Sequence, residues 1–180
     1  MDTAETKTPI LRLSLLPVVF SLAWPTMLEQ LMQTAVQYID TAMVGSLGTQ
    51  ATAAVGSTTT VNWLILLTVS AVGVGFLSYI SKAWGAEDFD RVRRAAGQSV
   101  LAVLVIGVTF TVLVLSLSRY IPRWMRVDPS VREMAAVYFF ILYIPMLPRA
   151  ASIIFGTVLR AVGDTKTPMR VGAGVNLVNV

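Results

Sequence analysis

The stretch Thr26–Met43, TMLEQLMQTAVQYIDTAM, has the length of a membrane helix but an unusual number of polar side chains. It contains two acids and three amides, which are Glu29, Gln30, Gln33, Gln37 and Asp40. Such groups are costly in the hydrocarbon core of a bilayer. Their arrangement around the helix therefore decides whether this stretch can cross a membrane.

The polar side chains of this stretch form one stripe along the predicted helix. Each residue of an α-helix advances by about 100°, so the other polar residues, together with Thr26, lie within about 100° of Glu29. Apolar residues such as Leu28 and Leu31 occupy the rest of the circle. A single stripe can be turned away from lipid as a unit. We predict that this helix lines an aqueous cavity; the alternative for the glutamines is simple bonding to neighbouring helices.

The composition of the whole chain indicates an integral membrane protein. Of its 180 residues, 55% are hydrophobic and 13% are charged, whereas a soluble domain is usually about a quarter charged. Without cysteine or histidine, disulfides and thiolate or imidazole metal sites are excluded. The net charge of +4 is expected in loops rather than on a nucleic-acid surface. No nucleophile–base pair is visible, so we expect neither an enzyme nor a cofactor.

Four segments have the length and composition of membrane spans, and a fifth starts near the end of the chain. A span needs about 20 mostly apolar residues. The expected order is a tail over 1–12, then spans over 16–42, 53–80, 95–118 and 131–159, and the start of a fifth at 168–180. A half-length helix would leave unsatisfied carbonyls in hydrocarbon. We therefore expect 13–180 to be an incomplete transmembrane lobe, and the chain to be a fragment.

The basic residues indicate the orientation of this lobe. The tail and the second and fourth connections hold nine of the Lys and Arg residues, against four in the first and third connections. The positive-inside rule then places the N-terminus in the cytoplasm. The four arginines of the third connection oppose this assignment without reversing it.

Charged residues inside the predicted spans are candidates for function. An intramembrane acid is a functional candidate by default, and Asp40 can exchange a proton or hold a small cation. Arg149 lies about 16 Å along the helix from Arg160, at a depth similar to that of Glu29. We predict a Glu29–Arg149 ion pair, because an unpaired charge there is expensive; the alternative is that Arg149 snorkels or meets water. Pro25 predicts a bend in the first span.

Two glycine-containing patterns have structural interpretations. Gly73 and Gly75 give the second span a small-residue face that predicts close helix approach. The sequence Gly163-Asp164-Thr165 lacks the strand-to-helix context of a phosphate loop, and it predicts a turn between two helices.

Several motifs in order resemble the multidrug and toxic compound extrusion (MATE) family of transporters. The matching residues are Pro25, Gln33, Asp40-Thr41-Ala42-Met43-Val44-Gly45-Ser46-Leu47-Gly48, Ala53-Ala54-Val55-Gly56, Trp84-Gly85-Ala86-Glu87-Asp88, Leu159-Arg160-Ala161-Val162-Gly163-Asp164-Thr165-Lys166-Thr167-Pro168-Met169 and Asn179. They resemble the first two spans of the family, its Gly-Ala loop, its Arg-Gly-Asp-Thr loop and an asparagine of its fifth span. The resemblance extends over nearly the whole chain from about Leu13.

This resemblance implies an all-α polytopic exporter of about twelve helices in two six-helix lobes around a central cavity. It implies efflux of cationic or amphipathic small molecules in exchange for sodium ions or protons, in a bacterial inner membrane. The partners expected are these substrates, membrane lipid and the remainder of the transporter. Two alternatives stay open: a flippase of lipid-linked oligosaccharides, which should have a more basic cavity, and a non-transporting membrane fragment or small assembly subunit.

The resemblance also implies roles for individual residues. Asp40 matches the family's cation- or proton-binding aspartate, with Gln33 and Asn179 as its polar neighbours, and sodium at Asp40 is the one metal ion expected. From the polar stripe itself, Glu29, Gln37 and Thr26 are expected in the substrate cavity. A further acid of the family's fifth span would lie just past Val180, so this chain lacks it.

Overall fold

The computed structural model describes the backbone of residues 8–179 and the side chains of 16–177. Within these residues the regular structure is entirely helical. The helices are α1 (Thr8–Ser46), α2 (Thr49–Gly85), α3 (Phe89–Leu117), α4 (Ile121–Trp124), α5 (Arg132–Tyr143), α6 (Met146–Ala161) and α7 (Lys166–Asn179). The all-α fold predicted from the sequence is therefore confirmed.

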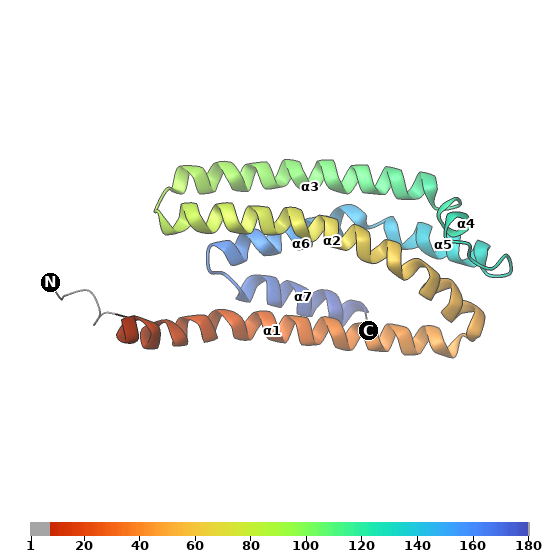
Figure 1. The fold of residues 1–180 in the computed structure, drawn as a ribbon, viewed down its shortest axis with the longest axis horizontal. Helices are drawn as coiled ribbons and strands as arrows, with labels where there is room; N and C mark the ends of the chain where they lie inside the picture. The colour runs from red at the N-terminus through yellow and green to blue at the C-terminus, as the bar shows by residue number, and fades with distance from the viewer. Residues whose placement is uncertain (1–7, 180) are drawn as a thin grey trace.

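The long helices run back and forth between two ends of an elongated bundle (Figure 1). Helix α6 packs against both α2 and α3, while α7 packs against α1 and α6. The α2–α3 and α6–α7 connections lie at the same end as the start of α1, and the α1–α2 connection and α4 lie at the other (Figure 1). Helix α7 therefore links α1 to α6, beside the direct packing of α1 on α2.

Two described helices, α2 and α3, are long and apolar enough to cross a membrane. The pair α5 and α6 passes the same test when taken together as one span bent by 53°. Helix α1 has 39 residues, which is longer than the predicted span 16–42. It also includes residues 8–12 of the predicted tail, and it continues through Pro17 and Pro25 as one helix.

The predicted fourth span, 131–159, corresponds to the bent pair of α5 and α6 and not to one continuous helix. It is divided at Pro145, between α5 and α6. Proline has no backbone N–H and cannot continue the hydrogen-bond ladder of α5. The carbonyl of Pro145 instead accepts the first bond of the new helix, from the Arg149 backbone N–H at 3.1 Å. The break changes the direction of the chain just before Arg149.

Close helix approach at glycine holds α6 in the bundle. A Cβ atom built on Gly73 of α2 would lie 2.9 Å from the Thr157 hydroxyl oxygen of α6, which confirms the predicted contact at this position. Gly75 has open space instead. On α3, a Cβ at Gly107 would lie 3.0 Å from the Cα of Leu147. The two glycines let α2 and α3 approach α6 at short distance.

Candidate functional site

Glu29 of α1 forms an ion pair with Arg160, near the end of α6. The Arg160 Nη2 donates to the Glu29 Oε2 at 2.7 Å. The two side chains are 8% and 27% exposed for Glu29 and Arg160 respectively. Gly172 of α7 lies against the same carboxyl group, since a Cβ there would be 3.5 Å from the Glu29 Cγ. Three helices therefore meet at the Glu29 carboxylate.

The predicted Glu29–Arg149 pair is replaced in the structure by the Glu29–Arg160 pair. Helices α1 and α6 run in opposite directions (Figure 1), so positions that rise along one helix fall along the other. Glu29 stands level with Arg160, and Asp40, about 16 Å further along α1, stands nearer to Arg149. The partner predicted for Glu29 therefore lies about three turns of α6 away from its actual partner, Arg160.

Asp40 belongs to a second polar group toward the other end of α1. Asp40 and Arg149 both interact electrostatically with the hydroxyl of Tyr138 on α5. Arg149 also acts on Tyr143, which is fully buried and whose hydroxyl donates to the Asn62 Oδ1 at 3.0 Å. Side chains from α1, α2, α5 and α6 thus belong to one polar group, in which Asp40 is exposed and Tyr143 is buried.

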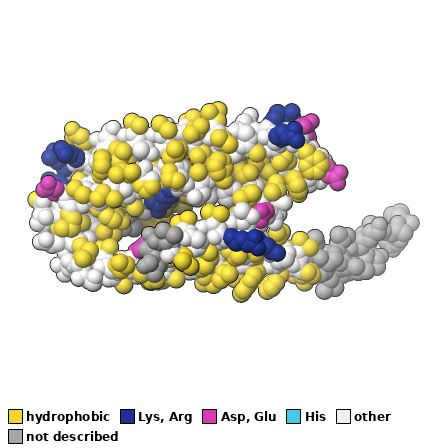
Figure 2. Space-filling model, turned by 180° about the vertical axis from the view of Figure 1, so that it is seen from behind, with side chains coloured by type: hydrophobic (Ala, Val, Ile, Leu, Met, Phe, Trp, Pro, Cys, Tyr) yellow, Lys and Arg dark blue, Asp and Glu magenta, His cyan; other side chains and the backbone are white. Residues whose placement is uncertain are grey.

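The amides of the stripe lie between these two polar groups. Gln33 and Gln37 are exposed, and they share the side of α1 that bears Glu29 and Asp40. From behind, the molecule is hollowed between α1 and the opposite helices, with acidic and basic side chains beside the hollow (Figure 2). An exposed polar side that faces a hollow agrees with an aqueous lining better than with lipid contact.

Two other predicted cavity residues lie differently. Thr26 is half-buried, and its hydroxyl donates to the Leu22 carbonyl at 3.2 Å. It lines a shallow groove with Gln30 and Thr34 that is formed by α1 alone. Asn179 is the last residue of α7, and its side chain lies outside the described residues. The predicted contact between Asn179 and Asp40 therefore stays a prediction.

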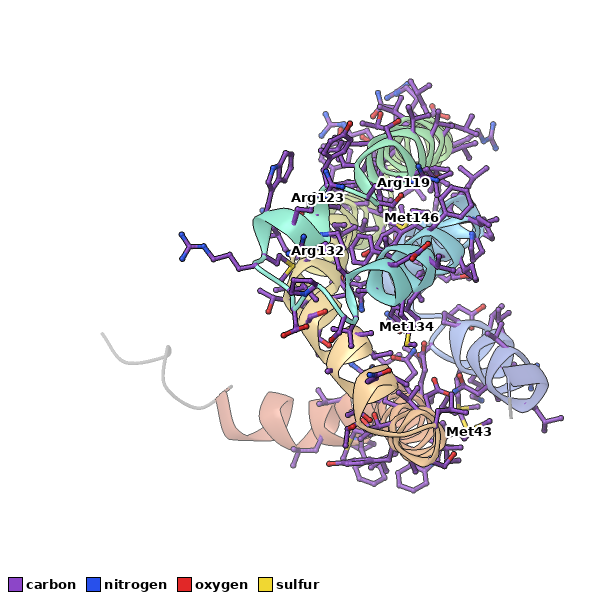
Figure 3. All side chains as sticks on the ribbon, turned by 90° about the vertical axis from the view of Figure 1, so that its right-hand side faces the viewer. Met43, Arg119, Arg123, Arg132, Met134 and Met146 are labelled. Carbon is purple, nitrogen blue, oxygen red and sulfur yellow. The ribbon has the colours of Figure 1, made fainter. Side chains whose placement is uncertain are left out.

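Methionine side chains accompany the polar stripe. Met43 of α1 and Met134 of α5 are 61% and 46% exposed. Seen from the α4 end, Met134 points from α5 toward α1 and α7, and Met43 points from α1 toward α7 (Figure 3). Methionine is flexible and polarisable, and it adapts to ligands of different shape. Arg119, Arg123 and Arg132 lie around α4 in the same view, away from α7.

The α6–α7 connection is the turn predicted from Gly163-Asp164-Thr165. Gly163 has a φ of +87°, which suits glycine. The Asp164 carboxylate accepts from the backbone N–H groups of Lys166 and Thr167 and from the Thr167 hydroxyl. These hydrogen bonds, above all those from Thr167, lower the pKa of Asp164. The turn therefore caps the start of α7 and keeps Arg160 close to that helix.

Sequence reasoning missed several members of these polar groups. Arg160 was assigned to a loop, and Tyr138, Tyr143 and Asn62 were not singled out. One signal was available: Asp40 and Arg149 stand 11 residues from Glu29 and Arg160, respectively, on helices that a four-span topology makes antiparallel. Equal spacing of opposite charges on antiparallel helices favours the pairing of Glu29 with Arg160.

Comparison with known proteins gives one family. A family model described as MatE matches residues 25–180. Over 159 residues, the chain is 28% identical to a probable multidrug resistance protein NorM of Thermotoga maritima, covering 88% of this chain and 34% of that relative. It is also 28% identical to the probable multidrug resistance protein YpnP of Bacillus subtilis over 154 residues, covering 85% of this chain and 34% of that protein.

A third relative, the probable multidrug resistance protein YoeA of Bacillus subtilis, is 29% identical over 145 residues, which are 80% of this chain and 31% of that protein. The chain thus spans about a third of the length of these relatives. No solved structure gives a significant match to the chain.

Proposed function

The chain belongs to the MatE family of multidrug and toxic compound extrusion transporters, and from this premise we propose that it forms part of the N-terminal lobe of a secondary active multidrug exporter. The exporter exchanges sodium ions or protons for cationic or amphipathic compounds across a bacterial inner membrane. The N-terminus lies in the cytoplasm, as the distribution of Lys and Arg favours.

This proposal is supported mainly by the polar side of α1 and the residues that it meets. Glu29 at one end of this side meets Arg160, and Asp40 toward the other end acts on Tyr138. Gln33 and Gln37 lie between them along the helix and are exposed, and the molecule is hollowed beside α1 (Figure 2). A transporter needs such a polar surface inside its bundle, where water and a charged substrate can enter.

Asp40 is the proposed binding site of the coupling ion. Its carboxylate is exposed on the polar side of α1, and Tyr138 adds a hydroxyl nearby. Carboxylate and hydroxyl oxygens suit a small hard cation, and a carboxylate can equally accept a proton. Ion binding changes the charge on this side of α1 and thereby shifts the balance between outward- and inward-open states. Gln33 and Asn179 are proposed as its polar neighbours.

The substrate path is proposed along the same side of α1. Gln37 supplies a hydrogen-bonding group, while Met43 and Met134 supply adaptable apolar contacts (Figure 3). An interior with an exposed acid suits an organic cation, because the Asp40 carboxylate offers it a counter-charge.

The test is drug efflux by the intact transporter in membrane vesicles, driven first by an imposed sodium gradient and then by an imposed pH gradient. Asp40→Asn keeps the shape of the side chain and removes its charge, so coupled efflux should be lost while insertion into the membrane is retained. Asp90→Asn, at an exposed site in the first turn of α3, is the matched control and should transport normally. Normal efflux by Asp40→Asn would exclude Asp40 from coupling.

A further inference from the structure

Glu29 has a different role from the one that its place in the polar stripe suggests. A residue that contacts substrate must be reachable from the interior of the bundle, but Glu29 is 6% exposed. Its carboxylate is engaged by Arg160 at 2.7 Å and packed against Gly172. The position is closed on two sides by α6 and α7.

The neighbours of Glu29 form a receptor for one carboxylate. Gly172 packs against this side chain, since a Cβ there would lie in ordinary contact with the Glu29 Cγ and Oε1, at 3.5 and 3.6 Å. The Arg160 Nη2 lies 4.0 Å from the Cβ position of Gly156 on its own helix. The Arg160 Nε is buried and makes no hydrogen bond within the described part of the chain. Glu29 therefore supplies the main counter-charge for the partly buried guanidinium of Arg160.

Helix α1 has few other anchors. Among the described helices it packs mainly against α7 and, after a short connection, against α2. Many of its large apolar side chains are exposed, such as Phe20, Leu31 and Tyr38. Apolar packing of this kind restricts rotation of a helix about its axis only weakly. A directed ion pair at one side chain restricts it much more.

Asp40 lies on the same side of α1 as Glu29, about 20° away around the helix axis and about 16 Å along it. Fixing the direction of Glu29 therefore fixes the direction of Asp40. We propose that the Glu29–Arg160 pair, seated against Gly172, is a positioning element that holds α1 in one rotation about its axis and thereby sets the direction of Asp40. Glu29 acts through Asp40 and does not contact the substrate. This inference rests on the proposed function in one respect, which is that Asp40 binds the coupling ion.

Cross-linking tests this positioning without measuring transport. This chain has no cysteine of its own, and two cysteine pairs are introduced into it after any cysteine in the remainder of the intact transporter has been replaced by serine. Asp40→Cys with Tyr138→Cys reports the rotation of α1, read with a short bismaleimide in native membranes that contain the intact transporter. Gly73→Cys with Thr157→Cys is the control, because the Cβ position of Gly73 lies 3.6 Å from the Thr157 Cβ, within the range for a disulfide.

Three changes are made in each background. Glu29→Gln and Arg160→Gln remove one charge each, and the exchange Glu29→Arg with Arg160→Glu reverses the pair. The proposal expects the Asp40–Tyr138 cross-link to be lost in either single variant and recovered in the exchange, while the Gly73–Thr157 disulfide forms at the parent rate throughout. Glu29→Asp, one methylene shorter, should give an intermediate yield, and it keeps the test informative if Glu29→Gln inserts poorly.

Two results would overturn the proposal. One is an Asp40–Tyr138 cross-link that persists at the parent rate when either charge is removed. The other is an equal loss of both cross-links, because the pair would then support packing of the whole bundle rather than the rotation of α1. Neither result depends on whether Asp40→Asn abolishes efflux, so failure of this proposal and failure of the proposed function are distinguishable.

Discussion

Glu29 of α1 and Arg160 of α6 are 131 residues apart in the sequence and form an ion pair with an N–O distance of 2.7 Å. The pair joins α1, the helix that carries the polar stripe, to α6, the helix that packs against both α2 and α3. Gly172 of α7 completes the contact. A buried charge that has lost one partner is strongly destabilising, so this pair should dominate the response of α1 to mutation.

The first prediction concerns the energetic coupling of this pair. Glu29→Gln and Arg160→Gln should each lower the free energy of unfolding by about 3–5 kcal/mol, and the double variant should lose clearly less than the sum of the two. Thermal unfolding of the protein in detergent, followed through a complete double-mutant cycle, measures this. Combining Glu29→Gln with Arg149→Gln is the control, and its losses should add. Additive losses for Glu29 and Arg160 would refute the coupling.

The second prediction compares two glycines on one helix. Gly107→Ala places a methyl group 3.0 Å from the Leu147 Cα, so it should lower stability by about 1–3 kcal/mol through overpacking. Gly97→Ala, which is also in α3, meets no atom within 4 Å. It should be neutral or raise stability by up to about 1 kcal/mol, because alanine favours the helix. Equal effects of the two substitutions on the unfolding temperature would argue against close packing of α3 on α6.

The third prediction concerns the turn before α7. Hydrogen bonds from Thr167 lower the pKa of Asp164, so the ionised carboxylate stabilises the start of α7. This stabilisation of α7 is fully present at pH values above the ordinary aspartate pKa of about 4. It is lost as the pH falls through the lower pKa that Asp164 has in the folded protein. Thr167→Val should raise the pKa of Asp164 toward its ordinary value, as a ¹³C NMR titration of the carboxyl group would measure. An unchanged pKa in Thr167→Val would contradict the assignment of the shift to these bonds.

The all-α membrane fold was predictable from the sequence for a physical reason. Apolar length and the polar stripe reflect the demands of a bilayer, and α2 and α3 follow the predicted spans 53–80 and 95–118 closely. The turn at Gly163 and the close approach at Gly73 were also predicted, because both depend on local backbone geometry. These features are determined by residues that are close together in the sequence.

Features that depend on how helices are placed beside one another were less predictable. The choice between Arg149 and Arg160 as the partner of Glu29 depends on the axial offset of α1 and α6, for which the sequence offers only the equal spacing of charges on the two helices. The 53° break in the fourth span had a visible cause in Pro145, but a single proline can either kink or end a helix. Tyr138 and Asn62 became candidates only when folding brought them to the interior beside Asp40 and Tyr143.

The fourth prediction concerns the cation near Asp40. Arg149 and Asp40 act on the same tyrosine hydroxyl, so the arginine places a positive charge close to the proposed ion site. Arg149→Gln should therefore strengthen binding of a monovalent cation by about tenfold, which corresponds to about 1.4 kcal/mol. Isothermal titration of the intact transporter with sodium measures this affinity. Arg94→Gln, at an exposed position in α3, should leave it unchanged, and weaker binding in Arg149→Gln would contradict the prediction.

The most direct test of the account is the solvent around the polar side of α1 in a lipid bilayer. Spin labels at Gln37, on the stripe, and at Tyr38, on the opposite side of the helix and 73% exposed, can be compared by collision with a water-soluble nickel chelate and with oxygen. The account predicts frequent collisions with the nickel chelate at position 37 and with oxygen at position 38. An oxygen-dominated, lipid-like profile at position 37 would contradict it.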